Sequence, residues 1–137
     1  MPNKPWKETE RRIARYIEAR TGHGRRNPLS GGNSGHTRSD IIHPHLFPEV
    51  KHGTACPRTW RTVEKLYKSV EILAAKEKKI PLLILHEKSK MGGVGEYDTY
   101  LRIALEDGTS PLICVPLQTA IELTSAADPA SIPGGAE

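Results

Sequence analysis

Residues 39–51 read Ser39-Asp40-Ile41-Ile42-His43-Pro44-His45-Leu46-Phe47-Pro48-Glu49-Val50-Lys51. The pattern predicts two short strands, at 39–43 and 46–51, around a Pro/His turn. Because strand side chains alternate between faces, Glu49 and Lys51 point the same way, and Asp40 can lie beside Glu49. A divalent ion with oxygen ligands relieves the repulsion between two such carboxylates, and a nearby lysine can stabilise an anionic transition state. The stretch therefore predicts either a metal-dependent hydrolytic site or a surface hairpin with three solvated charges.

The chain after this stretch predicts a helix and a buried strand. Residues 58–79 carry apolar side chains at the 3, 4, 7 spacing of an amphipathic helix. Pro81 then opens a continuous apolar run at 82–86, typical of a strand covered on both faces. A strand, a crossing helix and a second strand form a parallel connection. Pro48 lacks the N–H of a ladder bond, which predicts a bulge or one missing bond before Glu49. The expected apolar side of the helix comprises Trp60, Val63, Leu66, Tyr67, Val70, Leu73 and Ala74.

Weaker patterns complete the C-terminal part. Residues 97–105 alternate as a further strand, 112–115 indicate a short edge strand, and 117–123 indicate one or two helical turns. We expect a single domain over residues 1–124, because 137 residues can bury one core and not two. The composition from 125 to 137 predicts a disordered tail.

The chain before the opening stretch predicts a helix and a basic loop. Residues 7–21 form an amphipathic pattern that Gly22 stops, and Glu10 falls on its inward face. Such a carboxylate could pair with Arg25 or Arg26, or reach the site built by Asp40 and Glu49. Residues 22–38 are rich in glycine and arginine, which favours a flexible basic loop suited to phosphate contacts, or a plain linker.

The charge of the chain is unevenly distributed. Residues 1–78 carry 16 Lys and Arg against 8 Asp and Glu, whereas residues 79–137 carry 4 against 8. Positive charge in the half that holds the Asp/Glu/Lys group suits a polyanion, although it could merely solvate helix faces. No apolar run approaches the roughly 20 residues of a membrane span, and the two cysteines form no metal or disulfide motif, so we expect a cytoplasmic protein.

Taken in order, these segments resemble the PD-(D/E)xK nuclease superfamily, and within it the small Holliday junction resolvase-like enzymes of archaea and phages. The resemblance covers residues 6 to 105. It implies an α/β fold, with a restriction-endonuclease-like mixed sheet core flanked by helices in the order α-β-β-β-α-β-β. Ser39 stands where the superfamily has its name-giving proline. The matching pieces are Trp6-Lys7, Glu10-Arg11-Arg12-Ile13-Ala14, Arg25-Arg26-Asn27-Pro28-Leu29-Ser30-Gly31, Ser39-Asp40-Ile41 and Pro48-Glu49-Val50-Lys51-His52.

The resemblance also implies roles for individual residues. Asp40, Glu49 and the Val50 carbonyl would bind Mg²⁺, with Mn²⁺ as a substitute, and Lys51 would orient or activate the attacking water. Glu10 would lie at the rim of the metal site. DNA phosphates would be contacted by Arg11, Arg25, Arg26 and Arg38, and Ser30 or Ser34 would lie near the scissile bond. A resolvase of this kind acts on branched DNA as a homodimer, in the host cytoplasm if a phage encodes it, and residues 112–123 and Ile72 are candidates for the dimer surface.

Other functions remain open at the level of the sequence. A nuclease with this site could nick or trim other DNA substrates. A non-catalytic DNA-binding or scaffold protein would carry the same carboxylates as structural groups. A zinc-binding module is a further alternative, since four histidines and a cysteine crowd one stretch, although structural zinc sites usually contain cysteine pairs. These residues are His36, His43, His45, His52 and Cys56.

Overall fold

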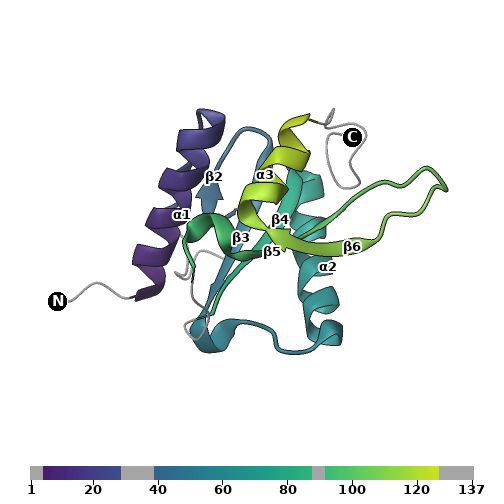
Figure 1. The fold of residues 1–137 in the computed structure, drawn as a ribbon, viewed down its shortest axis with the longest axis horizontal. Helices are drawn as coiled ribbons and strands as arrows, with labels where there is room; N and C mark the ends of the chain where they lie inside the picture. The colour runs from purple at the N-terminus through teal and green to yellow at the C-terminus, as the bar shows by residue number, and fades with distance from the viewer. Residues whose placement is uncertain (1–4, 29–38, 88–91, 127–137) are drawn as a thin grey trace.

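A computed structural model describes residues 5–28, 39–87 and 92–126 of the chain. Over these ranges the protein is mixed α/β, with three α-helices and a four-stranded mixed sheet (Figure 1). In chain order the helices and strands are α1 (Pro5–Thr21), β1 (Arg25–Arg26), β2 (Ile41–Ile42), β3 (Leu46–His52), α2 (Trp60–Lys76), β4 (Ile80–His86), β5 (Asp98–Arg102), β6 (Leu112–Pro116) and α3 (Leu117–Ala126), with single 3₁₀ turns η1 (Gly53–Ala55) and η2 (Val94–Glu96).

The main sheet has the strand order β3-β4-β5-β6. β3 and β4 run parallel, joined by α2, which confirms the predicted crossover, and the other neighbours are antiparallel. β1 and β2 form a separate antiparallel pair. α1 and α3 pack on one face of the main sheet, where their buried side chains share a core with Val50, Leu82 and Ile84. α2 packs on the other face.

The N-cap of α2 fixes where the helix begins, and its apolar side determines which face packs against the sheet. Thr59 and Thr62 form a reciprocal capping box that satisfies N–H groups at the start of the helix. The residues predicted for the buried side do face the sheet, with Val63, Tyr67, Val70 and Ala74 buried. Trp60 was expected among them and is instead 50% exposed, tilted against Tyr100 at a ring distance of 5.9 Å. It is the first residue of the helix, and periodicity does not tell how far the core extends along a helix.

The bulge predicted at Pro48 is wrong. β3 pairs with β4 residue for residue over its whole length, with Pro48 opposite Leu82. The Pro48 carbonyl accepts the backbone N–H of Asp40 at 3.1 Å on the outer side of β3. The N–H that proline lacks would therefore point to the outer side of β3, away from β4. No hydrogen bond between β3 and β4 is lost. Glu49 keeps regular strand geometry.

Boundaries differ from the prediction mainly at the ends. α1 begins at Pro5 and not at residue 7, β2 covers two residues of the expected five, and β5 stops at Arg102. β6 and α3 add two elements to the order implied by the resemblance, and α3 extends through 125 and 126, which had been assigned to the tail. Residues 29–38 of the predicted loop lie outside the described ranges. No helix in the described part of the chain has the length and apolarity that crossing a membrane requires.

Candidate active site

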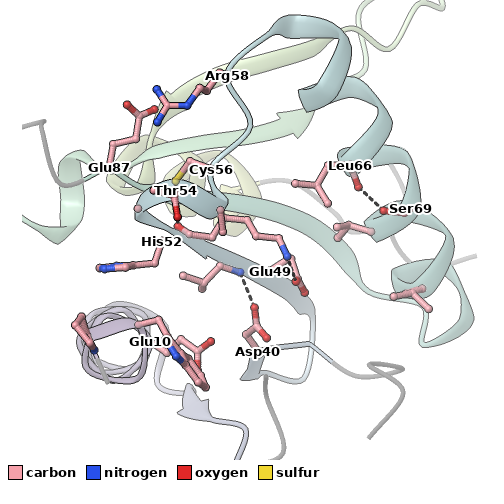
Figure 2. Close-up of a pocket in the computed structure, with 18 residues that line it drawn as sticks. Glu10, Asp40, Glu49, His52, Thr54, Cys56, Arg58, Leu66, Ser69 and Glu87 are labelled. Atoms are coloured by element: carbon pink, nitrogen blue, oxygen red, sulfur yellow. Dashed lines mark hydrogen bonds and ion pairs between the residues drawn. The ribbon is translucent and has the colours of Figure 1, made fainter. Parts of the chain in front are cut away.

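The predicted carboxylates meet at the outer edge of β3. Asp40 directly precedes β2 and is buried, with its backbone N–H bonded to Pro48 and its Oδ2 accepting the backbone N–H of Val50 at 2.7 Å. Asp40 thus contacts the strand on both sides of Glu49. Figure 2 shows Glu10, Asp40 and Glu49 around one cavity, with the Asp40 to Val50 bond as a dashed line. The sequence prediction that these residues come together is confirmed.

The backbone of Val50 adds an acceptor to this edge. In an extended strand the N–H and the C=O of one residue point to the same side. Since the Val50 N–H is directed at Asp40, the Val50 carbonyl faces the same outer edge. Main-chain oxygen therefore lies beside the two carboxylates, as the resemblance implies.

Glu49 carries an unusual charge environment. The pKa of Glu49 is raised to about 7, chiefly by burial and next by the negative charge of Asp40, while the positive charge of Lys51 opposes the rise. Lys51 Nζ lies 3.5 Å from Glu49 Oε2, with both side chains partly exposed to the cavity. A bound cation would relieve the repulsion that Asp40 exerts on the charged form of Glu49.

Glu10 serves as the partner of an arginine as well as a wall of the cavity. Its Oε1 accepts from Nε of Arg26 at 2.8 Å, and the guanidinium carbon lies 5.5 Å from the Trp6 ring centroid. The sequence allowed Glu10 to pair with an arginine or to reach the site. It does both, because it is bonded to Arg26 and also lines the cavity with Asp40. Nη2 of Arg26 is buried and donates a hydrogen bond to none of the described residues.

A close approach of the chain to α1 positions Arg26. Gly24 has φ +150°, and a Cβ there would lie 2.9 Å from the Ala14 carbonyl oxygen. Only glycine allows this approach, which brings β1 against α1. The Arg26 side chain thereby reaches Glu10 at the cavity.

The donor set fits a hard divalent cation. Two carboxylates and one main-chain carbonyl supply oxygen only, and Mg²⁺ completes its octahedron with water. Within residues 5–28, 39–87 and 92–126, no group of three or more His, Cys, Asp or Glu side chains is arranged to hold a metal. The third carboxylate, Glu10, is paired with Arg26, so Asp40 and Glu49 are the side-chain candidates.

The remaining predicted residues are less closely grouped. Arg11 lies 3.5 Å from Glu8 on the surface of α1, and Arg25 is exposed on β1. Ser30, Ser34 and Arg38 lie outside the described residues. Neither Arg11 nor Arg25 lines the cavity.

The histidines proposed as zinc ligands serve other contacts. His43 is buried, and its Nδ1 accepts the backbone N–H groups of His45 and Leu46 at 3.0 and 3.1 Å. Its Nε2 lies 3.0 Å from the Thr21 hydroxyl, so His43 holds the turn before β3 against the end of α1. Cys56 is buried, its thiol donates to the carbonyls of Lys51 and His86, and burial raises its pKa. His36 lies outside the described residues.

A second polar cluster next to the site was missed. The hydroxyl of Thr9, on α1, lies 2.9 Å from Nδ1 of His52 and 3.2 Å from Nδ1 of His86, and the two rings are also in hydrogen-bonding contact. His86 stacks on Tyr97. The cluster ties α1 to the C-terminal ends of β3 and β4. The sequence singled out His52 as a possible zinc ligand but did not connect it with Thr9 or His86.

The cavity is larger than the charged group. Its volume is about 920 Å³, and it extends from the carboxylates to α2, past the η1 turn. On the α2 side it is lined by Leu66, Ser69, Val70 and Leu73, and Figure 2 shows Leu66 and Ser69 facing it from the helix. The sequence placed the first, third and fourth of these in the core and did not predict that they border a cavity.

No family model matches the chain, and no match was found among curated proteins or solved structures. A functional conclusion therefore depends on the geometry of the chain's own residues. The features that bear on it are the carboxylate pair, Lys51, the Glu10–Arg26 ion pair and the cavity they share.

Proposed function

We propose that the chain is a metal-dependent DNA endonuclease with a restriction-endonuclease-like core, which hydrolyses phosphodiester bonds in branched DNA as Holliday junction resolvase-like enzymes do. One observation carries the proposal. Asp40 and Glu49 share the open edge of β3 with a Glu49 pKa raised to about 7, and Lys51 lies 3.5 Å from Glu49. Two carboxylates at low exposure beside each other cost stability, and a bound cation would offset that cost.

The residues divide the work of hydrolysis between them. Asp40, Glu49 and the Val50 carbonyl would hold Mg²⁺ or Mn²⁺, which supplies Lewis-acid stabilisation of the phosphoryl oxygens and a more acidic bound water. Lys51 orients the attacking water and stabilises the negative charge that develops on the phosphorus oxygens. Arg26 is bonded to Glu10 at the cavity wall and adds positive charge there, which favours the approach of a polyanion.

The partners follow from the same proposal. The excess of positive charge in residues 1–78 favours DNA as the ligand. Symmetric cutting of both strands of a junction requires two sites, so we propose a homodimer that acts in the cytoplasm, where the DNA of a cell or its phage is processed. The outer edge of β6, which lies in the uncharged run 108–121 and exposes Cys114 and Pro116, is the surface we assign to the dimer.

Cleavage assays with and without metal test the function. A four-way junction, a linear duplex and a flap are incubated with the protein in Mg²⁺ and in EDTA. We expect cuts only with Mg²⁺, most rapidly in the junction, and loss of cutting in Glu49→Gln with DNA binding retained. Glu122→Gln, the same change at an exposed position on α3, is the control and should cut like the wild type. Wild-type rates in Glu49→Gln would show that the site is wrongly assigned. Binding without cutting on every substrate would favour a non-catalytic DNA-binding protein.

A further inference from the structure

We propose that the cleft between β3 and α2 binds a single-stranded segment of DNA, with its bases against the apolar side chains of α2 and its phosphates at lysines along the outer rim. The inference rests on the proposed nuclease function and defines its substrate class. The DNA would carry unpaired nucleotides next to the bond that is cut.

The cleft provides more apolar surface than phosphate chemistry needs. Leu66, Val70 and Leu73 line the part of the cavity that lies beyond Glu49 and Lys51. Phosphodiester hydrolysis uses charged and polar groups only, whereas an apolar wall can contact the flat faces of nucleobases. At about 920 Å³ the cavity has room for more than the group under attack.

The charges of α2 are divided between its two flanks. Lys65 and Lys76 stand four residues before and seven residues after Ser69, so all three lie on one exposed stripe beside the cavity wall. Glu71 lies on the other flank, where its Oε2 accepts from Nε of Arg102 on β5 at 2.7 Å. Glu64 stands seven residues before Glu71 and shares that flank. The rim beside the cavity is therefore positive, which complements a phosphate backbone.

The opposite wall adds an aromatic ring. Trp6 lines the cavity from the first turn of α1, close to the guanidinium of Arg26. Arg58 is exposed and lines the cavity at the other end, where Glu87 lies beside it (Figure 2). An apolar floor with an aromatic side chain and cations along the rim is the composition of grooves that bind single strands without sequence preference.

This composition selects against a continuous duplex. In a duplex the base faces are stacked on one another, and a protein contacts only phosphates, sugars and base edges. The leucine and valine side chains that line the cavity with Glu49 can contact base faces only where a DNA strand is unpaired. Branches, flaps and single-stranded tails offer such nucleotides.

Fluorescence anisotropy in EDTA tests the inference without cleavage. The probes are a fluorescein-labelled dT12 and a labelled 12-base-pair duplex, and the protein is the full chain. The rim variant is Lys65→Glu with Lys76→Glu, and the wall variant is Leu73→Ser. For dT12 we expect affinity losses of about tenfold or more, because phosphate contacts and base contacts are removed, and for the duplex less than about threefold. Equal losses on both probes would overturn the inference.

Matched controls separate the cleft from general effects. Lys78→Glu makes the same charge change at an exposed position after α2, and Leu105→Ser makes the same apolar change in an exposed loop. Both should bind dT12 like the wild type, and the circular dichroism of all variants shows whether they fold. If the rim and wall variants bind dT12 as tightly as these controls, or if the wild type does not bind dT12, the proposal that the cleft binds single-stranded DNA is wrong, even if the protein cuts DNA. If the rim and wall variants lose dT12 binding but the wild type cuts no substrate, the proposed nuclease function is wrong and the proposal that the cleft binds single-stranded DNA is supported.

Discussion

The two edges of the main sheet, β3 and β6, differ in charge and in what lies beside them. β3 carries Glu49 and Lys51, has Asp40 bonded along its outer side and contains a proline at that side. β6 lies in a run of fourteen residues, 108–121, without a single Asp, Glu, Lys or Arg. Both are end strands of one sheet within the described residues. One edge holds charge at a cavity, and the other is apolar and neutral.

The difference shows two ways of treating a sheet edge. Edge strands are prone to pair with other chains, and charges or prolines discourage this. β3 uses Pro48 and the Asp40 contacts in that way, and the same charges build the candidate site. β6 has a proline at its end but lacks charges, which favours pairing with a second copy. We therefore expect the β3 edge to govern chemistry and the β6 edge to govern assembly.

Removing the amine at the β3 edge should have the largest effect. Lys51→Ala eliminates the cation next to Glu49, and we expect a loss of junction cleavage of at least about 100-fold, since groups that stabilise developing charge or transfer protons contribute on this scale. Single-turnover rates with Mg²⁺ measure it. Lys78→Ala, at an exposed position after α2, should leave the rate unchanged. A rate within threefold of the wild type in Lys51→Ala would remove lysine from the mechanism.

The start of the β3 edge should be sensitive to acid through His43. Burial lowers the pKa of His43 to about 4, assisted by the nearby positive charges of His45, His23 and Lys79. Because its Nδ1 accepts two backbone N–H groups, the neutral ring carries its proton on Nε2, which faces the Thr21 hydroxyl. Protonation of Nδ1 would place its N–H against the N–H groups of His45 and Leu46, and both hydrogen bonds would be lost. His43 is thus stable in the fold only as the neutral form.

The sign of the pH effect follows from the lowered pKa. Between the ordinary value of 6.5 and about 4, the unfolded chain binds a proton that the folded chain does not, so stability falls as the pH falls through this window. The contribution lost is roughly 3 kcal/mol at 1.36 kcal/mol per pKa unit. His43→Asn keeps an acceptor near Nδ1 and cannot protonate. Thermal midpoints from pH 7.5 to 4.5 should therefore converge for wild type and variant, and parallel curves would contradict the assignment.

The sequence predicted the β3 edge better than its surroundings. Alternation along a strand sufficed to place Glu49 and Lys51 on one face, and the 3, 4, 7 spacing identified the buried side of α2 apart from Trp60. These are local periodicities that the backbone imposes. Pro48 was misjudged because the sequence did not tell which side of β3 carries β4.

Contacts across the fold were beyond such patterns. The sequence left Glu10 with two options, and the Glu10–Arg26 pair depends on how Gly24 lets the chain approach α1. The Thr9–His52–His86 cluster joins residues up to 77 positions apart. Such contacts depend on how elements pack, which a single sequence does not reveal.

Asp40 allows structure and chemistry at the β3 edge to be separated. Asp40→Ala leaves the buried Val50 N–H without its acceptor, at a cost of about 1–3 kcal/mol. Asp40→Asn retains an oxygen acceptor and should cost clearly less. Both remove the negative charge, so both should stop cleavage. Urea denaturation at pH 7 gives the free energies of unfolding, and equal losses in the two variants would show that the bond to Val50 contributes little.

The neutral edge provides the smallest expected effect. If two copies of β6 pair antiparallel about a two-fold axis, the middle residue Cys114 faces its copy, and Cys114 is exposed. Mild oxidation should then yield a disulfide-linked dimer in the wild type and not in Cys114→Ser, since Cys56 is buried. Cys114→Lys sets two positive charges opposite each other, and we expect the dimer to weaken about tenfold, or 1.4 kcal/mol, in sedimentation equilibrium. Because the β3 edge lies at the opposite side of the sheet, Cys114→Lys should keep its affinity for dT12. A dimer that resists Cys114→Lys would place the interface elsewhere and leave the contrast between the two edges without a role in assembly.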